Sequence, residues 1–212
     1  MDFAELISQV KHLPVINTQI LSAGALKPDA IKVQISRWEK AGKLIQLKRG
    51  IYILAEPYRG IEIFEPAVAS LLKRPSYISL EKALEFHNLI PEAVNVYTAV
   101  TTKRQGRFNT PVGIFDYRHI QQSLFWGYHS LEVRKQTAFM AEPEKSILDL
   151  IYFRHVDVSM DYLAELRLQN VEKINLRKLS EYARRFGKPR MEQSAAMIKD
   201  YVLAYKKKEK TL

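Results

Sequence analysis

The spacing of hydrophobic residues changes from helical to strand-like within the first 57 residues, and this change constrains the fold more than any other feature. Phe3–Val10 carries apolar residues three and four positions apart, which is the spacing of one helix face. A second, shorter helix is predicted to begin at Asn17 or Thr18 and to end at Gly24. Pro28 opens a third helix, because proline is favoured in the first turn.

A β-hairpin is predicted directly after these three helices. Gly42 suits the position that follows a helix C-terminus. Between Leu44 and Leu54, β-branched and aromatic residues flank a turn at Lys48-Arg49-Gly50. Three short helices followed by a hairpin is the element order of a winged helix-turn-helix, whose third helix enters the DNA major groove beside the hairpin, the wing. We therefore predict a winged helix-turn-helix DNA-binding domain over residues 1–57.

The third helix has an inward and an outward face. With Ile31, Ile35 and Trp38 inward, the positions predicted to contact DNA are Lys32, Val33, Ser36, Arg37 and Lys40. Arg37 can pair with guanine O6 and N7, Ser36 can bond a base or a phosphate, and Val33 can contact a thymine methyl group. The lysines of this set are predicted phosphate contacts, together with Lys48 and Arg49 on the wing.

The remaining chain is expected to form a second, larger domain over residues 62–212. Glu56–Gly60 is the predicted link between the two domains. Helical spacing at both ends of the second domain encloses three predicted strands, Val94–Thr101, Val112–Tyr117 and Ser123–Tyr128, and a basic loop at Lys103–Arg107. We expect an α+β fold in which an antiparallel sheet is flanked by helices and the C-terminal end is helical.

Basic side chains are concentrated at the two ends of the chain. The net charge is +10; residues 1–60 hold nine basic and five acidic side chains, and residues 161–212 hold 13 and seven. A basic balance favours a polyanionic partner such as nucleic acid. The lysines at 206–208 and 210 are expected to form an unstructured tail, which either assists DNA binding without reading sequence or is only a solubilising end.

Missing motifs exclude several classes of enzyme. The eight glycines lie at least seven residues apart, so there is no G-x-G-x-x-G and no P-loop, and G-x-S-x-G is also absent. There is no cysteine and no pair of histidines at a metal-binding spacing. We predict no catalytic residue, no metal ion and no cofactor. One alternative stays open, since Asp116 with Glu132 and Arg134 resembles the carboxylates and cation of some metal-dependent nucleases.

The chain is expected to be cytoplasmic, without a membrane partner. No apolar run approaches the length of about 18 residues that a membrane span needs. The acidic start at Met1–Glu5 lacks the positive region of a secretory signal. The absence of cysteine fits a reducing compartment.

Three stretches of the chain resemble the AbiEi family of antitoxins from abortive-infection type IV toxin–antitoxin systems. They are Gly42–Tyr52 (GKLIQLKRGIY), Ser76–Glu92 (SYISLEKALEFHNLIPE) and Ala141–Leu150 (AEPEKSILDL), and the likeness extends over residues 1–155. The resemblance implies that the winged helix binds inverted repeats in double-stranded DNA near its own promoter. It also implies that the second domain counteracts a nucleotidyltransferase-like toxin, with or without direct contact.

The sequence therefore predicts a sequence-specific autorepressor and antitoxin that is not an enzyme. The first alternative is a stand-alone winged-helix transcription regulator whose second domain serves dimerisation or ligand sensing. The second alternative is a metal-dependent DNA nuclease built on Asp116 and Glu132. An adjacent gene for a nucleotidyltransferase-like protein favours the antitoxin, whereas metal-dependent DNA cleavage that is lost in Asp116→Ala favours the nuclease.

Overall fold

A computed structural model describes residues 1–23 and 28–209 as a mixed α+β protein with two sheets. Its N-terminal part contains six elements in the order α1 (Phe3–Val10), β1 (Ile16–Asn17), α2 (Thr18–Ala23), α3 (Pro28–Lys40), β2 (Leu44–Lys48) and β3 (Ile51–Leu54). The three helices and the hairpin predicted from the sequence are confirmed as elements. Gly24, the predicted end of the second helix, lies outside the described residues.

Local chemistry accounts for where these elements begin and end. The side chain of Asp2 accepts a hydrogen bond from the Glu5 amide, and the Glu5 side chain accepts one from the Asp2 amide, which closes a capping box on α1. Gly42 follows α3 with a φ of +68°, and Gly50 turns the hairpin with a φ of +80°, a conformation that favours glycine. The antiparallel sheet has the strand order β1-β3-β2.

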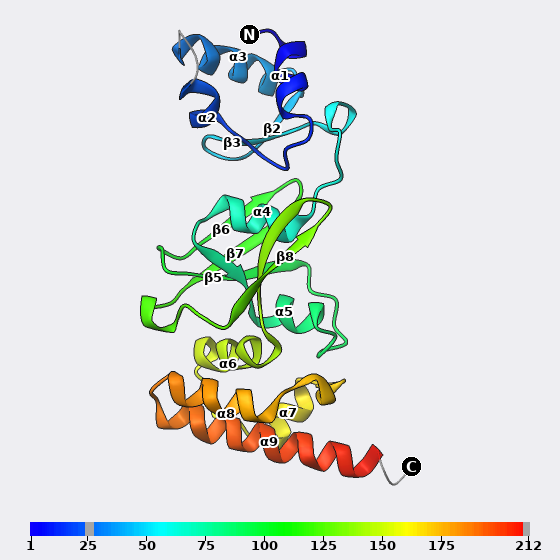
Figure 1. Ribbon diagram of the computed structural model, residues 1–212, viewed down its shortest axis with the longest axis vertical. Helices are drawn as coiled ribbons and strands as arrows, with labels where there is room; N and C mark the ends of the chain where they lie inside the picture. The colour runs from blue at the N-terminus through cyan, green and yellow to red at the C-terminus, as the bar shows by residue number, and fades with distance from the viewer. Residues whose placement is uncertain (24–27, 210–212) are drawn as a thin grey trace.

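The β2–β3 hairpin is buried on both faces. Alternate residues of a strand point to opposite faces, and here Tyr52 and Leu54 belong to the N-terminal core with Leu6, Val10, Ile16, Ile31, Ile35, Trp38 and Leu44. Ile51 and Ile53 point the other way, and with Leu47 they join the core of the second part of the chain. Figure 1 shows the hairpin between the N-terminal helices and the larger sheet. The hairpin is therefore a shared layer, not a wing that projects freely into solvent.

The second sheet has six strands in the order β6-β7-β5-β4-β9-β8. Its strands are β4 (Ser76–Ile78), β5 (Val96–Thr101), β6 (Gly106–Thr110), β7 (Gly113–His119), β8 (Tyr128–Val133) and β9 (Gln136–Ala141). Two pairs are parallel, β5 with β7 and β4 with β9. The other three pairs are antiparallel, so the sheet is mixed and the expectation of a wholly antiparallel sheet is wrong. The direction of pairing depends on which distant segments meet.

The predicted strands of this sheet are only partly confirmed. The strands predicted around residues 94–101 and 112–117 correspond to β5 and β7, whereas β4, β6 and β9 were not predicted. Ser123–Tyr128 is wrong as a strand, since a 3-10 turn occupies Gln122–Leu124 and β8 begins only at Tyr128. The loop expected at Lys103–Arg107 is shorter, because β6 already begins at Gly106.

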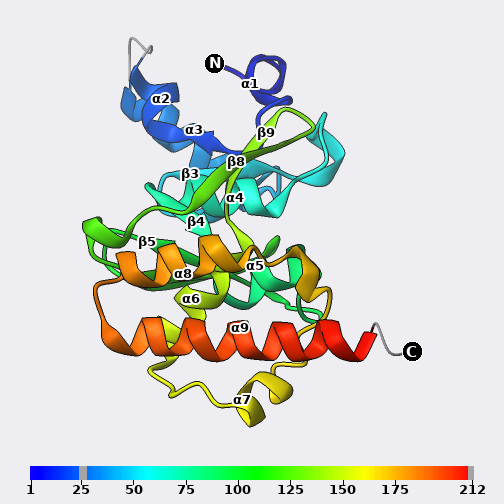
Figure 2. The same ribbon diagram turned by 60° about the horizontal axis from the view of Figure 1, so that its bottom comes forward.

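Helices cover both faces of the second sheet. The helix α4 (Glu65–Leu72) lies between the hairpin and the sheet, while α5 (Leu80–Phe86) and α6 (Pro143–Arg154) lie on the opposite face (Figure 1). Beyond them lie α7 (Met160–Glu165), α8 (Leu176–Arg185) and α9 (Pro189–Glu209), and Figure 2 shows α8 and α9 side by side. Short 3-10 turns occupy Glu56–Tyr58, within the predicted link, and Val171–Lys173.

The lysines at 206–208 lie in the last turns of α9, so the expectation of an unstructured tail is wrong up to Glu209. Lys210 lies beyond the described residues. No helix in the described ranges is long and apolar enough to cross a membrane.

Candidate nucleic-acid interface

The helix α3 presents the side chains that its sequence spacing predicts. Ile31, Ile35 and Trp38 are buried in the N-terminal core. The five predicted DNA contacts of this helix are all exposed: Lys32, Val33, Ser36, Arg37 and Lys40. Val33 is 52% exposed, which leaves its methyl groups free to contact a ligand. The predicted division of α3 into a buried face and an exposed face is therefore confirmed.

The charges at the two ends of α3 suit the helix dipole. Asp29 lies in the first turn, and Arg37 and Lys40 lie in the last turn. Lys32 pairs with Asp29 at 2.9 Å, with both side chains mostly exposed. An exposed pair of this kind contributes little stability, so Lys32 can leave Asp29 for a phosphate at little cost.

Lys48 and Arg49 lie next to each other at the hairpin tip but have different environments. Arg49 is exposed, whereas Lys48 is half-buried and its ammonium group donates a hydrogen bond to the carbonyl oxygen of Leu72 at the end of α4. The Lys48 ammonium also lies 5.8 Å from the centre of the Phe108 ring. Burial lowers the pKa of Lys48. This lysine therefore anchors the hairpin to the second part of the chain.

A groove of about 840 Å³ runs between α3, the hairpin and α4. Its polar lining includes Lys32 and Ser36 from α3, Arg49 from the hairpin and Arg74 from the segment after α4. The backbone amide of Thr18 donates to the carbonyl oxygen of Gly50 at 3.0 Å, which ties the start of α2 to the hairpin tip. Of the predicted residues, Lys32 and Ser36 on α3 and Lys48 and Arg49 on the hairpin thus border one depression. Val33, Arg37 and Lys40 are exposed on α3 but do not line it.

The second part of the chain adds basic side chains beside the hairpin. The Lys73 ammonium donates to the Arg104 carbonyl oxygen at 2.6 Å and lies 5.5 Å from the centre of the Phe108 ring. Burial lowers the pKa of Lys73, and the positive charges of Lys48 and Arg104 lower it further. Within the described ranges, none of Lys48, Lys73, Arg74 and Arg104 forms a salt bridge.

This extension of the basic surface was not predicted from the sequence. Residues 61–160 are neutral in total, so their charge balance hides a local cluster. The dipeptide Lys73-Arg74 and the segment Lys103–Arg107 were the available signals. They become neighbours only because β6 pairs with β7 at the sheet edge and approaches β2.

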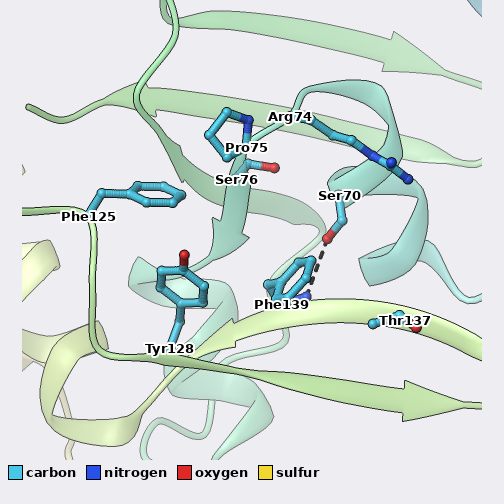
Figure 3. A pocket seen from close by; sticks show the side chains of 8 residues that line it. All are labelled: Ser70, Arg74, Pro75, Ser76, Phe125, Tyr128, Thr137 and Phe139. Carbon is cyan, nitrogen blue, oxygen red and sulfur yellow. Dashed lines mark hydrogen bonds between the residues drawn. The ribbon is translucent and has the colours of Figure 1, made fainter. Parts of the chain in front are cut away.

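A second cavity, of about 380 Å³, lies between the β8–β9 hairpin and the segment that joins α4 to β4 (Figure 3). Three aromatic rings, those of Phe125, Tyr128 and Phe139, line it together with Arg74, Pro75 and small hydroxyl residues. The Phe139 amide donates to Ser70 Oγ at 3.3 Å, drawn as the dashed line. Tyr128 points its hydroxyl into the space between Phe125 and Ser76. This cavity can take a small apolar molecule.

Asp116 and Glu132 do not form a metal site. Asp116 lies on β7 and pairs with Arg118 at 3.1 Å, whereas Glu132 lies on β8. Three strands separate β7 from β8, which at about 4.8 Å a strand puts the two residues roughly 19 Å apart. No cluster of three metal-ligating side chains occurs among residues 1–23 and 28–209. The hypothesis that this carboxylate pair serves a nuclease is therefore wrong.

A buried polar cluster joins α6 to β4. Lys145 and Asp149, both fully buried, form an ion pair. The hydroxyl groups of Tyr77 and Ser79 donate to Asp149 Oδ2 at 3.0 Å and 2.8 Å, and Lys145 Nζ donates to the Tyr77 hydroxyl at 2.9 Å. Burial lowers the pKa of Lys145, and the Asp149 charge opposes that shift. None of the four residues lines a cavity described above, so the cluster acts as an internal support.

Comparisons with known proteins leave the family open. A scan against models of protein families finds no match, and a search of curated proteins finds no relative. The resemblance to AbiEi antitoxins therefore rests on the three stretches quoted above.

Proposed function

We propose that this protein is a winged-helix, sequence-specific DNA-binding autorepressor that acts as the antitoxin of a type IV toxin–antitoxin system in the cytoplasm. The observation that carries the DNA-binding part is the exposed face of α3, from which Lys32 and Ser36 line a groove together with Arg49 and Arg74. The order α1-β1-α2-α3-β2-β3 supports the winged-helix assignment, because that motif places a hairpin directly after three helices. In this motif the third helix enters the major groove.

The roles of the interface residues follow from their chemistry. Arg37 reads guanine with its planar guanidinium, while Ser36 and Val33 contact neighbouring base edges. Lys32, Lys40 and Arg49 contact phosphates and set the register. Lys48 acts indirectly by holding the hairpin against α4. Arg74, which lines the groove, adds a phosphate contact from outside the predicted DNA-binding domain.

The antitoxin part of the proposal is supported by the resemblance alone. Two of the similar stretches, Ser76–Glu92 and Ala141–Leu150, contain β4, α5 and much of α6. They include Tyr77, Ser79, Lys145 and Asp149, the four residues of the buried cluster. These four residues of the similar stretches therefore maintain the core of the second part of the chain. The partner we propose, on the resemblance, is a nucleotidyltransferase-like toxin.

A stand-alone regulator with a sensing domain is the second candidate. The aromatic cavity of Phe125, Tyr128 and Phe139 favours it, because ligand sites are concave and mostly apolar.

Two experiments test the proposal. Binding of the full chain to its own upstream DNA and to a scrambled duplex, measured by fluorescence anisotropy, should show a preference of at least about 10³-fold for the upstream DNA. Co-expression with the adjacent gene should restore growth that this gene alone arrests. Upstream DNA bound no better than scrambled DNA contradicts the repressor. Arrested growth despite normal expression of both proteins contradicts the antitoxin and leaves the stand-alone regulator.

A further inference from the structure

An apolar cavity of about 340 Å³ lies where the N-terminal elements meet α4. Its aliphatic lining includes Val10 from α1, Leu13 and Val15 from the following loop, Leu21 from α2, Ile51 from β3 and Leu71 from α4. Its volume is at the small end of the range for ligand sites, and such sites favour the contact between two domains. Leu13 remains 42% exposed at the wall of this cavity, so the apolar lining is accessible from solvent.

Arg74 is the one charged residue among the described residues that line this cavity. In the part of the chain that the structure describes, Arg74 makes neither a salt bridge nor a side-chain hydrogen bond. The other polar residue, Asn17, already accepts a hydrogen bond from the Gln19 amide at 2.9 Å. The described lining therefore combines an apolar body with the positive charge of Arg74.

We propose that this cavity binds a small aliphatic carboxylate, whose hydrocarbon part packs against Leu13, Leu21 and Leu71 and whose carboxylate pairs with Arg74. The complementarity is of two kinds. A guanidinium group binds a carboxylate through two parallel hydrogen bonds. The described residues of the walls are aliphatic and include no aromatic ring, which favours a flexible hydrocarbon over a stacked heterocycle.

The site is placed to regulate DNA binding, a consequence that rests on the proposed function. Arg74 and Leu71 line both this cavity and the groove beside α3 and Arg49. A carboxylate on Arg74 removes one cation from the DNA-facing groove. The ligand also fills space between α4 and α2, the helix that precedes α3. The bound carboxylate therefore weakens DNA binding.

Titration of the full chain with sodium decanoate, followed by calorimetry, tests the site without DNA. Decanoate should bind with a stoichiometry of one. Butyrate, whose hydrocarbon chain is six methylene groups shorter, and decyltrimethylammonium, which has the wrong charge, should bind at least about tenfold more weakly. Arg74→Gln should weaken decanoate about tenfold or more, because it removes a charge-assisted hydrogen bond. Decanoate that gives no saturable heat overturns the proposal, as does equal binding by Arg74→Gln.

Two matched variants locate the binding. Leu13 and Phe139 are both exposed apolar residues, 42% and 38%, and each lines a different one of the two smaller cavities. Leu13→Glu puts a negative charge beside the proposed site and should weaken decanoate about tenfold, whereas Phe139→Glu should leave it unchanged. The reverse result assigns the ligand to the aromatic cavity and overturns the proposal. Urea unfolding of both variants checks that they remain folded.

A DNA titration separates this inference from the proposed function. Saturating decanoate should lower the affinity for the upstream DNA and reduce the salt slope by about one unit, as Arg74→Gln does. A chain that binds decanoate as described but binds no DNA refutes the proposed function and leaves the carboxylate site intact. A chain that binds DNA but not decanoate refutes the carboxylate site only.

Discussion

The ammonium group of Lys48, at the tip of the β2–β3 hairpin, donates a hydrogen bond to the carbonyl oxygen of Leu72 at the end of α4. This bond joins the proposed wing to the helix that covers the second sheet. Leu47, Ile51 and Ile53 reinforce the contact, because they are buried in the core of the second part of the chain. The orientation of α3 relative to the second sheet is therefore set by packing and not by a flexible link.

Lys48→Ala should affect mainly stability, and Arg49→Ala should affect mainly DNA binding. Lys48→Ala should lower the free energy of unfolding by about 1 kcal/mol, since it leaves the Leu72 carbonyl oxygen without this donor. Arg49→Ala should change stability by less than about 0.5 kcal/mol, because the side chain is exposed, but should reduce the salt slope of DNA binding by about one unit. Urea unfolding and DNA titrations at several salt concentrations measure both. A loss of stability in Arg49→Ala alone would contradict these roles.

Arg37→Ala should relax the choice of DNA sequence. A bidentate guanine contact contributes about 1–3 kcal/mol of discrimination, so the ratio of affinities for upstream and scrambled DNA should fall about tenfold or more. Lys40→Ala is the matched control, since it removes an exposed cation from the same last turn of α3. It should weaken both DNAs alike. If Arg37→Ala also weakens both DNAs equally, Arg37 contacts only phosphate.

Asp149→Asn should destabilise the fold strongly. It leaves the buried Lys145 without a counter-charge, and removing one partner of a buried pair costs about 3–5 kcal/mol. Replacing both residues, as Lys145→Met with Asp149→Leu, should cost less than Asp149→Asn alone, because no unpaired charge remains. Urea unfolding at neutral pH measures each variant. A loss below about 1 kcal/mol in Asp149→Asn would show that the pair is not a support.

Stability should fall between neutral pH and pH 5 partly because of His87. Burial lowers the pKa of His87, while the Ala141 carbonyl oxygen, 2.7 Å from Nε2, opposes the shift. Below the ordinary histidine pKa of about 6.5 the unfolded chain binds more protons than the folded one, so stability is lost as the pH falls through the lowered pKa. The variant His87→Gln should lose less stability over this range. The exposed His155 is the control, and His155→Gln should follow the wild type.

Removal of residues 206–212 should leave DNA binding unchanged. The lysines at 206–208 belong to α9, and Figure 1 shows α9 and α3 at opposite ends of the long axis of the molecule. A duplex on α3 therefore lies far from these lysines. Titrations at several salt concentrations should give the same affinity and the same salt slope as the full chain. A flatter salt slope would mean that the end of α9 reaches the DNA.

The residues of α3 illustrate how much of the candidate site can be predicted from the sequence. The helix spacing of Ile31, Ile35 and Trp38 correctly separates the buried face from the exposed one. Lys48 illustrates the limit of such prediction. It is basic and adjacent to Arg49 in the sequence, so both residues received the same predicted role. Only the packing of the hairpin against α4 distinguishes an anchor from an exposed cation.

The sequence alone determined the helices, the hairpin and their order in residues 1–57, since hydrophobic spacing, caps and turn residues act between near neighbours in the chain. Tertiary structure decided how distant segments meet. It placed β4 parallel to β9, buried both faces of the hairpin, and separated Asp116 from Glu132 by three strands. It also placed Arg74 beside α3. These features depend on which surfaces exclude water together, and that choice is made by the whole chain and not by any local pattern.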